Sequence, residues 1–147
     1  MSGRLIHGVI RCLDWLESKV PAKKDEPVHL HTGRRGEQDT YFYLRRSGYI
    51  IVARNFCSPR RRGEIDLIGW DKDVLCFIEV KTRTSHAVKP AEAAVDQHKK
   101  RELSAVAREF LRPLPPDCPC RFDVVSVYYE LPGHPTFELF RNAFAMS

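Results

Sequence analysis

Long hydrophobic runs are absent from the 147-residue sequence. A membrane-spanning helix needs about 20 consecutive apolar residues, and no stretch of this chain approaches that length. The opening residues, MSGRLIHGVIRCLDWLES, also lack the apolar centre of a secretory signal and carry Asp14 and Glu17. These absences argue against a membrane or exported protein, and they predict a cytoplasmic one.

Cysteine is sparse and irregularly spaced. The odd number of cysteines and their scattered positions suggest no disulfide framework. One residue separates Cys118 from Cys120, where a zinc knuckle normally has two or more. We therefore expect free thiols, as in a reducing compartment. The five cysteines are Cys12, Cys57, Cys76, Cys118 and Cys120.

Positive charge is in moderate excess. The chain has 24 lysines and arginines against 19 aspartates and glutamates, a formal net charge of +5. This balance favours an anionic partner, with nucleic acid ahead of a membrane surface. Hydrophobic residues at 43% and charged residues at 29% are typical of a globular protein, and the length fits one hydrophobic core.

The chain divides into a short N-terminal extension and one main domain. Apolar residues at helical spacing predict an amphipathic helix over residues 4–18, followed by a proline-bearing linker over 18–33. Docking on the main domain, pairing with a second chain and lying on a membrane all stay open for this helix. We assign residues 1–32 to the extension and 33–147 to the domain.

The main domain is predicted to be α/β. A helix over 33–48 ends at Gly48, a suitable residue to follow a helix. Pro90 can open a second helix that runs to residue 111. The predicted order is α-β-β-β-α-β-β, a mixed sheet of four to five strands flanked by helices. The strands are expected over 49–56, 63–70, 74–82, 121–130 and, on an edge, 136–144.

The second and third strands form a predicted hairpin with unusual charges. A turn centred on residues 72–73 sets Ile68 opposite Phe77 and Asp66 opposite Glu79, on one face of the sheet. Lys81 points to that face as well. A turn one residue longer would shift the register and separate the two acids. The other face carries Ile65, Leu67, Ile78 and Val80, so both faces are apolar and both are expected to be covered.

Two opposed carboxylates at the end of an apolar face repel each other and are costly to desolvate. One explanation is a plain ion-pair cluster in which Lys81 neutralises Asp66 and Glu79. The other is a hard divalent cation, Mg²⁺ or Mn²⁺, bound by oxygen ligands. Such an ion would accept a phosphate oxygen and activate water, and the lysine could orient that water.

Glu37 is a further candidate. It lies early in the first predicted helix of the domain, and the apolar residues Tyr41 and Leu44 follow it at helical spacing. It would then face the sheet as a ligand of the site. The alternative is an acid that only stabilises the start of its helix, by roughly 0.3–1 kcal/mol.

These residues have a familiar arrangement. Asp66 followed by Glu79-Val80-Lys81 resembles the core of the PD-(D/E)xK nuclease superfamily. The wider context, over residues 33–144, resembles the YraN-like family of uncharacterised bacterial proteins. The segments that carry this resemblance are GRRGE (33–37), LRRSGYIIVARNF (44–56), RRGEIDLI (61–68), FIEVKTR (77–83), PAEAAVD (90–96), CRFDVVSV (120–127) and NAF (142–144).

The resemblance implies a restriction-endonuclease-like core, related in layout to archaeal Holliday-junction resolvases. It implies metal-ligand roles for Asp66 and Glu79, a catalytic role for Lys81, and an additional ligand at Glu37. Ile65 replaces the proline that often precedes the motif's aspartate, a substitution that is common in the superfamily.

Basic residues near these positions are candidates for nucleic-acid contacts. Arg60, Arg61 and Arg62 precede the strand of Asp66 and could grip phosphates, or could simply be solvated. Lys99 falls near the inner face of the second helix and could reach the site or cover the core with its stem. Arg35 is a weaker candidate.

The resulting hypothesis is a phosphodiesterase that uses Mg²⁺ or Mn²⁺ and acts on DNA rather than RNA, including branched or damaged DNA. Two alternatives stay open. One is a nucleic-acid-binding module without activity, and the other is a dimeric scaffold that needs a partner. A homodimer would fit symmetric cutting of two strands, since that needs two sites.

Overall fold

The structure is a computed structural model, and it describes residues 28–83, 95–131 and 134–147. The predicted helix over 4–18 and the predicted helix start at Pro90 lie outside these residues. None of the described helices is long and apolar enough to cross a membrane. The four cysteines of the described part are free, as expected.

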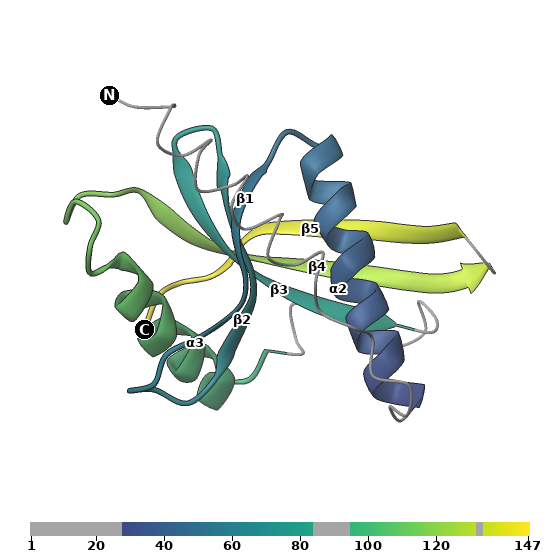
Figure 1. Cartoon of the computed structure of the whole chain (residues 1–147), viewed down its shortest axis with the longest axis horizontal. Helices are drawn as coiled ribbons and strands as arrows, with labels where there is room; N and C mark the ends of the chain where they lie inside the picture. Colours follow the sequence, from purple (N-terminus) through teal and green to yellow (C-terminus); the bar gives the residue numbers. More distant parts are fainter. Residues whose placement is uncertain (1–27, 84–94, 132–133) are drawn as a thin grey trace, which may run out of the picture.

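One five-stranded mixed sheet forms the centre of the molecule (Figure 1). Its strands lie in chain order, β1-β2-β3-β4-β5, and only β3 and β4 run parallel. The α/β order α-β-β-β-α-β-β and the edge position of β5 are as predicted. The elements are α2 (Val28–Arg46), β1 (Ile50–Cys57), β2 (Glu64–Asp71), β3 (Val74–Arg83), α3 (Gln97–Leu111), β4 (Cys120–Leu131) and β5 (His134–Phe144).

The helices cover opposite faces of the sheet. Helix α2 places Tyr41 and Leu44 against one face, and α3 places Leu103 and Val106 against the other. Strand β3 shows the division, because Phe77 packs on the α3 side while its neighbours at 76 and 78 pack on the α2 side. Both faces of the hairpin are therefore buried, as its two apolar patterns predicted.

Helix α2 begins earlier than predicted. It starts at Val28, so residues 28–32, which were expected to belong to a linker, are helical. No glycine or proline interrupts the segment from Val28 to Thr32, and packing further along the helix outweighs its weak local preference. The predicted end is confirmed, because Gly48 follows the helix with φ +94°.

Helix α3 begins later than predicted. Asp96 is extended, with φ −71° and ψ 168°, and its side chain accepts a hydrogen bond from the Lys99 amide. Aspartate is a preferred residue for this capping role, because it satisfies an amide that has no partner within the helix. A continuous helix from residue 90 is therefore wrong.

The hairpin register is confirmed from the turn outward. Asp71 pairs with Val74, Ile68 with Phe77, and the ladder ends at the pair Leu67–Ile78. Asp66 and Glu79 come next. We predicted that they would be paired directly across the two strands, and they are not.

The strand on the other side of β2 has an unusual backbone conformation opposite Asp66. Asn55 lies opposite Asp66, between the pairs Arg54–Leu67 and Phe56–Ile65, and has φ +49°. A left-handed residue interrupts the strict alternation of side chains. In β2 itself, Ile65 packs on the α3 side with Ile68, and its predicted place beside Leu67 is wrong.

Candidate active site

Near its C-terminal end, strand β3 presents a glutamate and a lysine side by side, Glu79 and Lys81. Glu79 is buried, with 7% of its side chain exposed, and Lys81 Nζ lies 2.9 Å from its Oε1. Lys99 Nζ, from the first turn of α3, lies 3.8 Å from the same oxygen, so the structure shows the first of the two positions left open for this residue. The second oxygen, Oε2, is shielded from solvent and has no hydrogen-bond partner.

Asp66 reaches this site from β2. Its Oδ2 accepts a hydrogen bond from the backbone amide of Val80, at 2.7 Å, directly between Glu79 and Lys81. Burial first, and then the negative charge of Glu79, raise the pKa of Asp66 to about 8. The Val80 hydrogen bond and Lys99 only partly oppose this shift. The aspartate therefore keeps a proton near neutral pH unless a cation joins it.

Glu37 faces the same region from α2. Burial raises its pKa, and the charges of Glu64 and Glu79 add to the effect. Asn55 bridges two of these acids. With its amide nitrogen toward them, it donates to Glu37 Oε2 at 3.2 Å and to Glu64 Oε1 at 3.1 Å. The inward orientation predicted for Glu37 is thus observed.

Sequence reasoning missed Asn55 and Glu64. Asn55 had a weak signal, because asparagine is one of the few non-glycine residues that tolerate a positive φ inside a strand. Glu64 had none beyond its place two residues before Asp66, since alternation alone cannot indicate that α2 brings Glu37 to it.

A fully paired acid elsewhere in the protein provides a contrast. Asp123 is completely buried, and its Oδ1 accepts from Arg121 Nε at 2.8 Å and from the Asn142 amide at 2.9 Å. Its Oδ2 accepts from the Tyr49 hydroxyl at 3.4 Å. This is what a structural buried carboxylate requires, and Glu79 and Asp66 lack such complete pairing.

The ion-pair explanation is therefore only partly realised. Lys81 and Lys99 both approach Glu79, but one oxygen of Glu79 has no partner and Asp66 is held by a single backbone amide. Within the described residues, no three acidic, histidine or cysteine side chains group closely enough to hold a metal by themselves. Mg²⁺ commonly uses one or two carboxylates and completes its shell with water and phosphate. Asp66 and Glu79 fit that pattern, and Glu37 faces the same region from α2.

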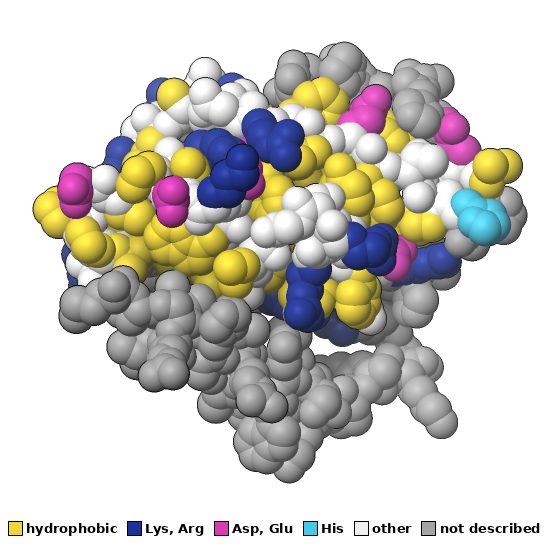
Figure 2. Space-filling view, turned by 90° about the horizontal axis from the view of Figure 1, so that it is seen from above, with side chains coloured by type: hydrophobic (Ala, Val, Ile, Leu, Met, Phe, Trp, Pro, Cys, Tyr) yellow, Lys and Arg dark blue, Asp and Glu magenta, His cyan; other side chains and the backbone are white. Residues whose placement is uncertain are grey.

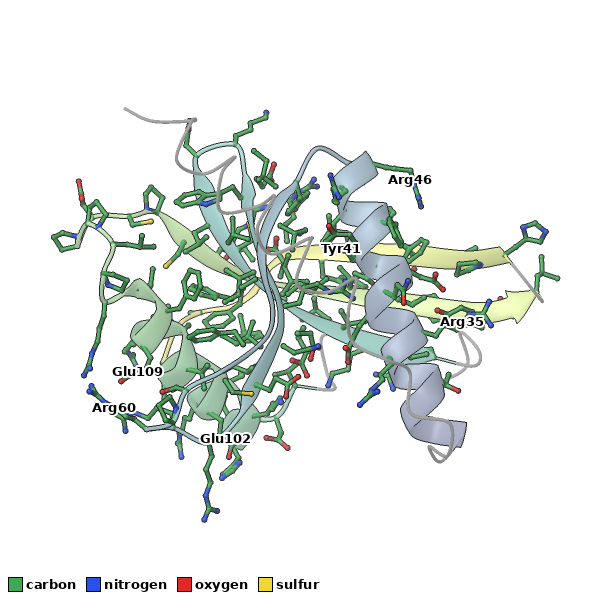
Figure 3. The ribbon with its side chains drawn as sticks, viewed as in Figure 1. Arg35, Tyr41, Arg46, Arg60, Glu102 and Glu109 are labelled. Carbon is green, nitrogen blue, oxygen red and sulfur yellow. The ribbon has the colours of Figure 1, made fainter. Side chains whose placement is uncertain are left out.

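The predicted arginine loop lies between β1 and β2. Arg60 and Arg61 are exposed, and each lies within 4.0 Å of the carboxylate of Glu109 on α3. Arg112 joins the same carboxylate at 3.4 Å. Figure 3 shows Arg60 and Glu109 together beside α3. Arg62 is also exposed, so the loop presents several cations around one acid.

Arg35 has a local role in the structure. It forms an ion pair with Asp39, one turn further along α2, at 3.7 Å. Its guanidinium also stacks over the ring of Tyr129, 4.9 Å from the centroid. The stacking contact with Tyr129 joins α2 to β4.

A hollow in the described surface contains none of the candidate residues. It lies between α2 and the start of β5. It is small, and charged and apolar side chains both line it, so it does not indicate a particular class of ligand. Its lining residues are Asp39, Phe42, Arg46, His134, Pro135 and Phe137.

Comparison with known proteins identifies the family. The model of the uncharacterised protein family UPF0102 matches residues 36–127. A UPF0102 protein of Koribacter versatilis is 52% identical over 123 residues, which cover 84% of this chain and 85% of that protein. One from Solibacter usitatus is 44% identical over 113 residues, covering 76% and 84%. One from Symbiobacterium thermophilum is 44% identical over 115 residues, covering 76% and 94%.

These matches confirm the resemblance to YraN-like proteins, and they extend over the strands that carry Asp66, Glu79 and Lys81. The relatives' descriptions name the family and no activity. On this similarity, the chain belongs to the uncharacterised protein family UPF0102.

Proposed function

We propose that this protein is a metal-dependent nucleic-acid phosphodiesterase of the endonuclease type, with DNA favoured over RNA. The observation that carries the proposal is the buried, half-paired carboxylate of Glu79, beside Asp66 and 2.9 Å from Lys81 Nζ. A buried carboxylate whose pKa is raised, as that of Asp66 is, beside a second buried acid and a positioned lysine marks a candidate functional site.

Each residue of the site has a distinct part in the proposed reaction. Asp66 and Glu79 would hold Mg²⁺ or Mn²⁺, and Glu37 would be a further ligand from α2. The ion would polarise the scissile phosphate and lower the pKa of water. Lys81 would orient the attacking water or neutralise charge that develops on the phosphate.

The charge distribution supports a nucleic-acid substrate. The sequence carries a net charge of +5, and exposed arginines lie in the 58–63 loop between β1 and β2. On the face shown in Figure 2, basic side chains form local groups among hydrophobic ones and no continuous stripe. The proposal therefore places the phosphate contacts around the site and the loop. A cytoplasmic location and a homodimer belong to the same proposal.

The test is a cleavage assay with matched variants. Labelled single-stranded, duplex, flapped and four-way-junction DNA, and one RNA duplex, are incubated with Mn²⁺, Mg²⁺ or EDTA. We compare wild type with Lys81→Met, Glu79→Gln and Asp66→Asn, and use Arg46→Gln as the control because Arg46 is exposed at the end of α2.

Metal-dependent products should appear with wild type and Arg46→Gln, and each site variant should lose at least about a hundredfold in rate. Equal rates for wild type and all three site variants would contradict the proposed site. One observation favours the second candidate, a binding module without turnover: Lys81 is already paired with Glu79. Salt-sensitive binding of DNA without cleavage in any metal would select that function.

A further inference from the structure

Two lysine ammonium groups share one carboxylate oxygen at the candidate site. Lys81 Nζ donates a hydrogen bond to Glu79 Oε1 at 2.9 Å, which satisfies that oxygen. Lys99 Nζ lies 3.8 Å from the same oxygen, so it contributes charge but no hydrogen bond. The other oxygen, Oε2, is shielded from solvent and has no partner in the described part of the chain. The glutamate therefore has one cation more than its single charge needs and one oxygen without a donor.

The local preferences of a helix do not explain a lysine at position 99. The first turn of α3 reads QHKK, over residues 97–100, and contains no acidic residue. The helix dipole favours acidic side chains at this end and disfavours basic ones. The backbone of Lys99 is fixed there, because its amide donates to Asp96 Oδ1 at 2.8 Å. The side chain is 34% exposed, so the ammonium is held near Glu79 by charge alone and is free to leave it.

Ion pairs that stabilise the fold have a different geometry. Arg121 Nε donates to Asp123 Oδ1 at 2.8 Å, and its Nη2 donates to Asp71 Oδ2 at 2.7 Å. Lys99 makes no such hydrogen bond to Glu79, yet its charge also acts on Asp66, where it opposes the rise in the pKa of that acid. Lys99 thus faces both acids of the candidate site, and it supplies the positive charge that an ion between them would supply.

We propose that Lys99 is the counter-ion of Glu79 while metal is absent, and that it turns to a phosphate of the nucleic acid when metal binds. The inference rests on the proposed function and gives Lys99 a defined part in it. A divalent cation bound by Glu79 and Asp66 would repel the ammonium, since both positive charges compete for the same carboxylate. The lysine stem is flexible, so the ammonium can leave Glu79 without movement of α3. Metal binding and phosphate binding are thereby coupled.

The first test measures metal binding without nucleic acid. Mn²⁺ affinities of wild type, Lys99→Met, Lys99→Arg and Lys100→Met are obtained from the electron paramagnetic resonance signal of free Mn²⁺. Lys100 is the matched control, because it belongs to the same turn and its ammonium lies 5.6 Å from the centre of the Phe144 ring. Lys99→Met should bind Mn²⁺ roughly tenfold more tightly than wild type, since a competing charge is removed. Lys99→Arg and Lys100→Met should stay near wild type.

The second test measures DNA binding with and without a divalent cation. Affinities for a labelled duplex are determined from about 50 to 200 mM salt, in EDTA and in Ca²⁺, a hard cation that also takes oxygen ligands. In EDTA, wild type and Lys99→Met should bind alike, because Lys99 is paired with Glu79. With Ca²⁺, wild type should gain more affinity than Lys99→Met, and its salt slope should be steeper by about one.

The two tests separate this inference from the proposed function. Tighter Mn²⁺ binding by Lys99→Met, with the expected difference in Ca²⁺ but no cleavage by wild type in any metal, would keep the inference and reject the nuclease. Unchanged or weaker Mn²⁺ binding by Lys99→Met would overturn the inference even with cleavage intact, because Lys99 would then be only a structural partner of Glu79. Equal gains in DNA affinity with Ca²⁺ for wild type and Lys99→Met would overturn it too.

Discussion

Asp66 shows how a single carboxylate can be held in an unfavourable state. It accepts one backbone hydrogen bond, at 2.7 Å from the Val80 amide, while burial and the charges of Glu79 and Glu37 raise its pKa. A raised pKa means that the folded protein binds a proton which the unfolded chain releases. In the absence of metal, the ionisation of Asp66 therefore opposes folding.

This state gives a pH-dependent prediction for the metal-free protein. The pKa of Asp66 rises from 3.8 to about 8 on folding, so its contribution to the free energy of unfolding falls as pH increases through that interval. Asp66→Asn should gain stability over wild type, and the gain should grow from pH 4 to pH 8. Urea unfolding in EDTA at several pH values measures it.

The exposed turn residue Asp73 supplies the control for this experiment, since Asp73→Asn should show no comparable growth. Adding Mn²⁺ at pH 8 should stabilise wild type more than Asp66→Asn, because the ion replaces the proton. A difference between wild type and Asp66→Asn that is constant with pH would contradict this account of the site.

At the scale of elements, helix α2 approaches the end of β3 through a glycine. A Cβ added at Gly36 would lie 2.1 Å from Thr82 Oγ1, whereas one added at Gly33 would meet nothing within 4 Å. Thr82 lies between Lys81 and Arg83, so this close approach fixes the distance between α2 and the site.

The two glycines form a matched pair for mutation. Gly36→Ala should destabilise the protein by about 1–3 kcal/mol, the usual cost of overpacking, because β-branched Thr82 is stiff. Gly33→Ala should stabilise by about 0.5–1 kcal/mol, as expected in a helix. Urea unfolding measures both, and Thr82→Ala should restore much of the loss in Gly36→Ala. Equal stabilities for the two alanine variants would show that α2 can move freely.

The start of α3 sets the position of Lys99. Asp96 accepts from the Lys99 amide at 2.8 Å, and its carbonyl accepts from the Lys100 amide at 2.9 Å. These bonds fix the first turn of the helix, from which Lys99 Nζ comes within 3.8 Å of Glu79.

Loss of this cap should therefore affect both stability and the site. Asp96→Ala should cost about 0.5–2 kcal/mol, whereas Asp96→Asn keeps an acceptor and should cost little. Thermal unfolding of both variants checks this. If the alanine and asparagine variants unfold at the same temperature, the cap does not hold the helix start.

At the scale of the whole molecule, positive charge is partly neutralised where nucleic acid is proposed to bind. Glu109 is largely buried, with 12% of its side chain exposed, and pairs with Arg60, Arg61 and Arg112. The three arginine side chains remain more than half exposed, so they can contact phosphates. The negative charge of Glu109 neutralises part of their positive charge.

Removing that acid should strengthen non-specific binding. Glu109→Gln should increase DNA affinity several-fold at low salt and steepen the dependence on salt, because more arginine charge becomes available to phosphates. Glu102→Gln is the matched control. Glu102 also lies on α3 (Figure 3), where it pairs only with His98 among the described basic residues. Equal gains in the two variants would indicate an effect of net charge alone and contradict a binding role for the loop.

Much of the fold could be predicted because its signals are local. Alternating apolar residues define the hairpin, and the turn fixes its register as far as Leu67–Ile78. The candidate residues Asp66, Glu79 and Lys81 were found by the same means, as charges that interrupt an apolar pattern. The start of α2 at Val28 and of α3 after Asp96 were missed, since weak local preferences yield to packing and capping.

The sequence by itself determined the order of the elements, the edge position of β5 and the strands that carry the acids, because side-chain periodicity depends only on neighbours along the chain. Only the tertiary structure decided how the charges are paired. It turned Asp66 toward the Val80 amide, brought Lys99 to Glu79, set Glu109 among the arginines and left the buried Oε2 of Glu79 without a hydrogen-bond partner. Those outcomes depend on distances between elements far apart in the chain, and electrostatic energy follows distance and burial rather than position in the sequence.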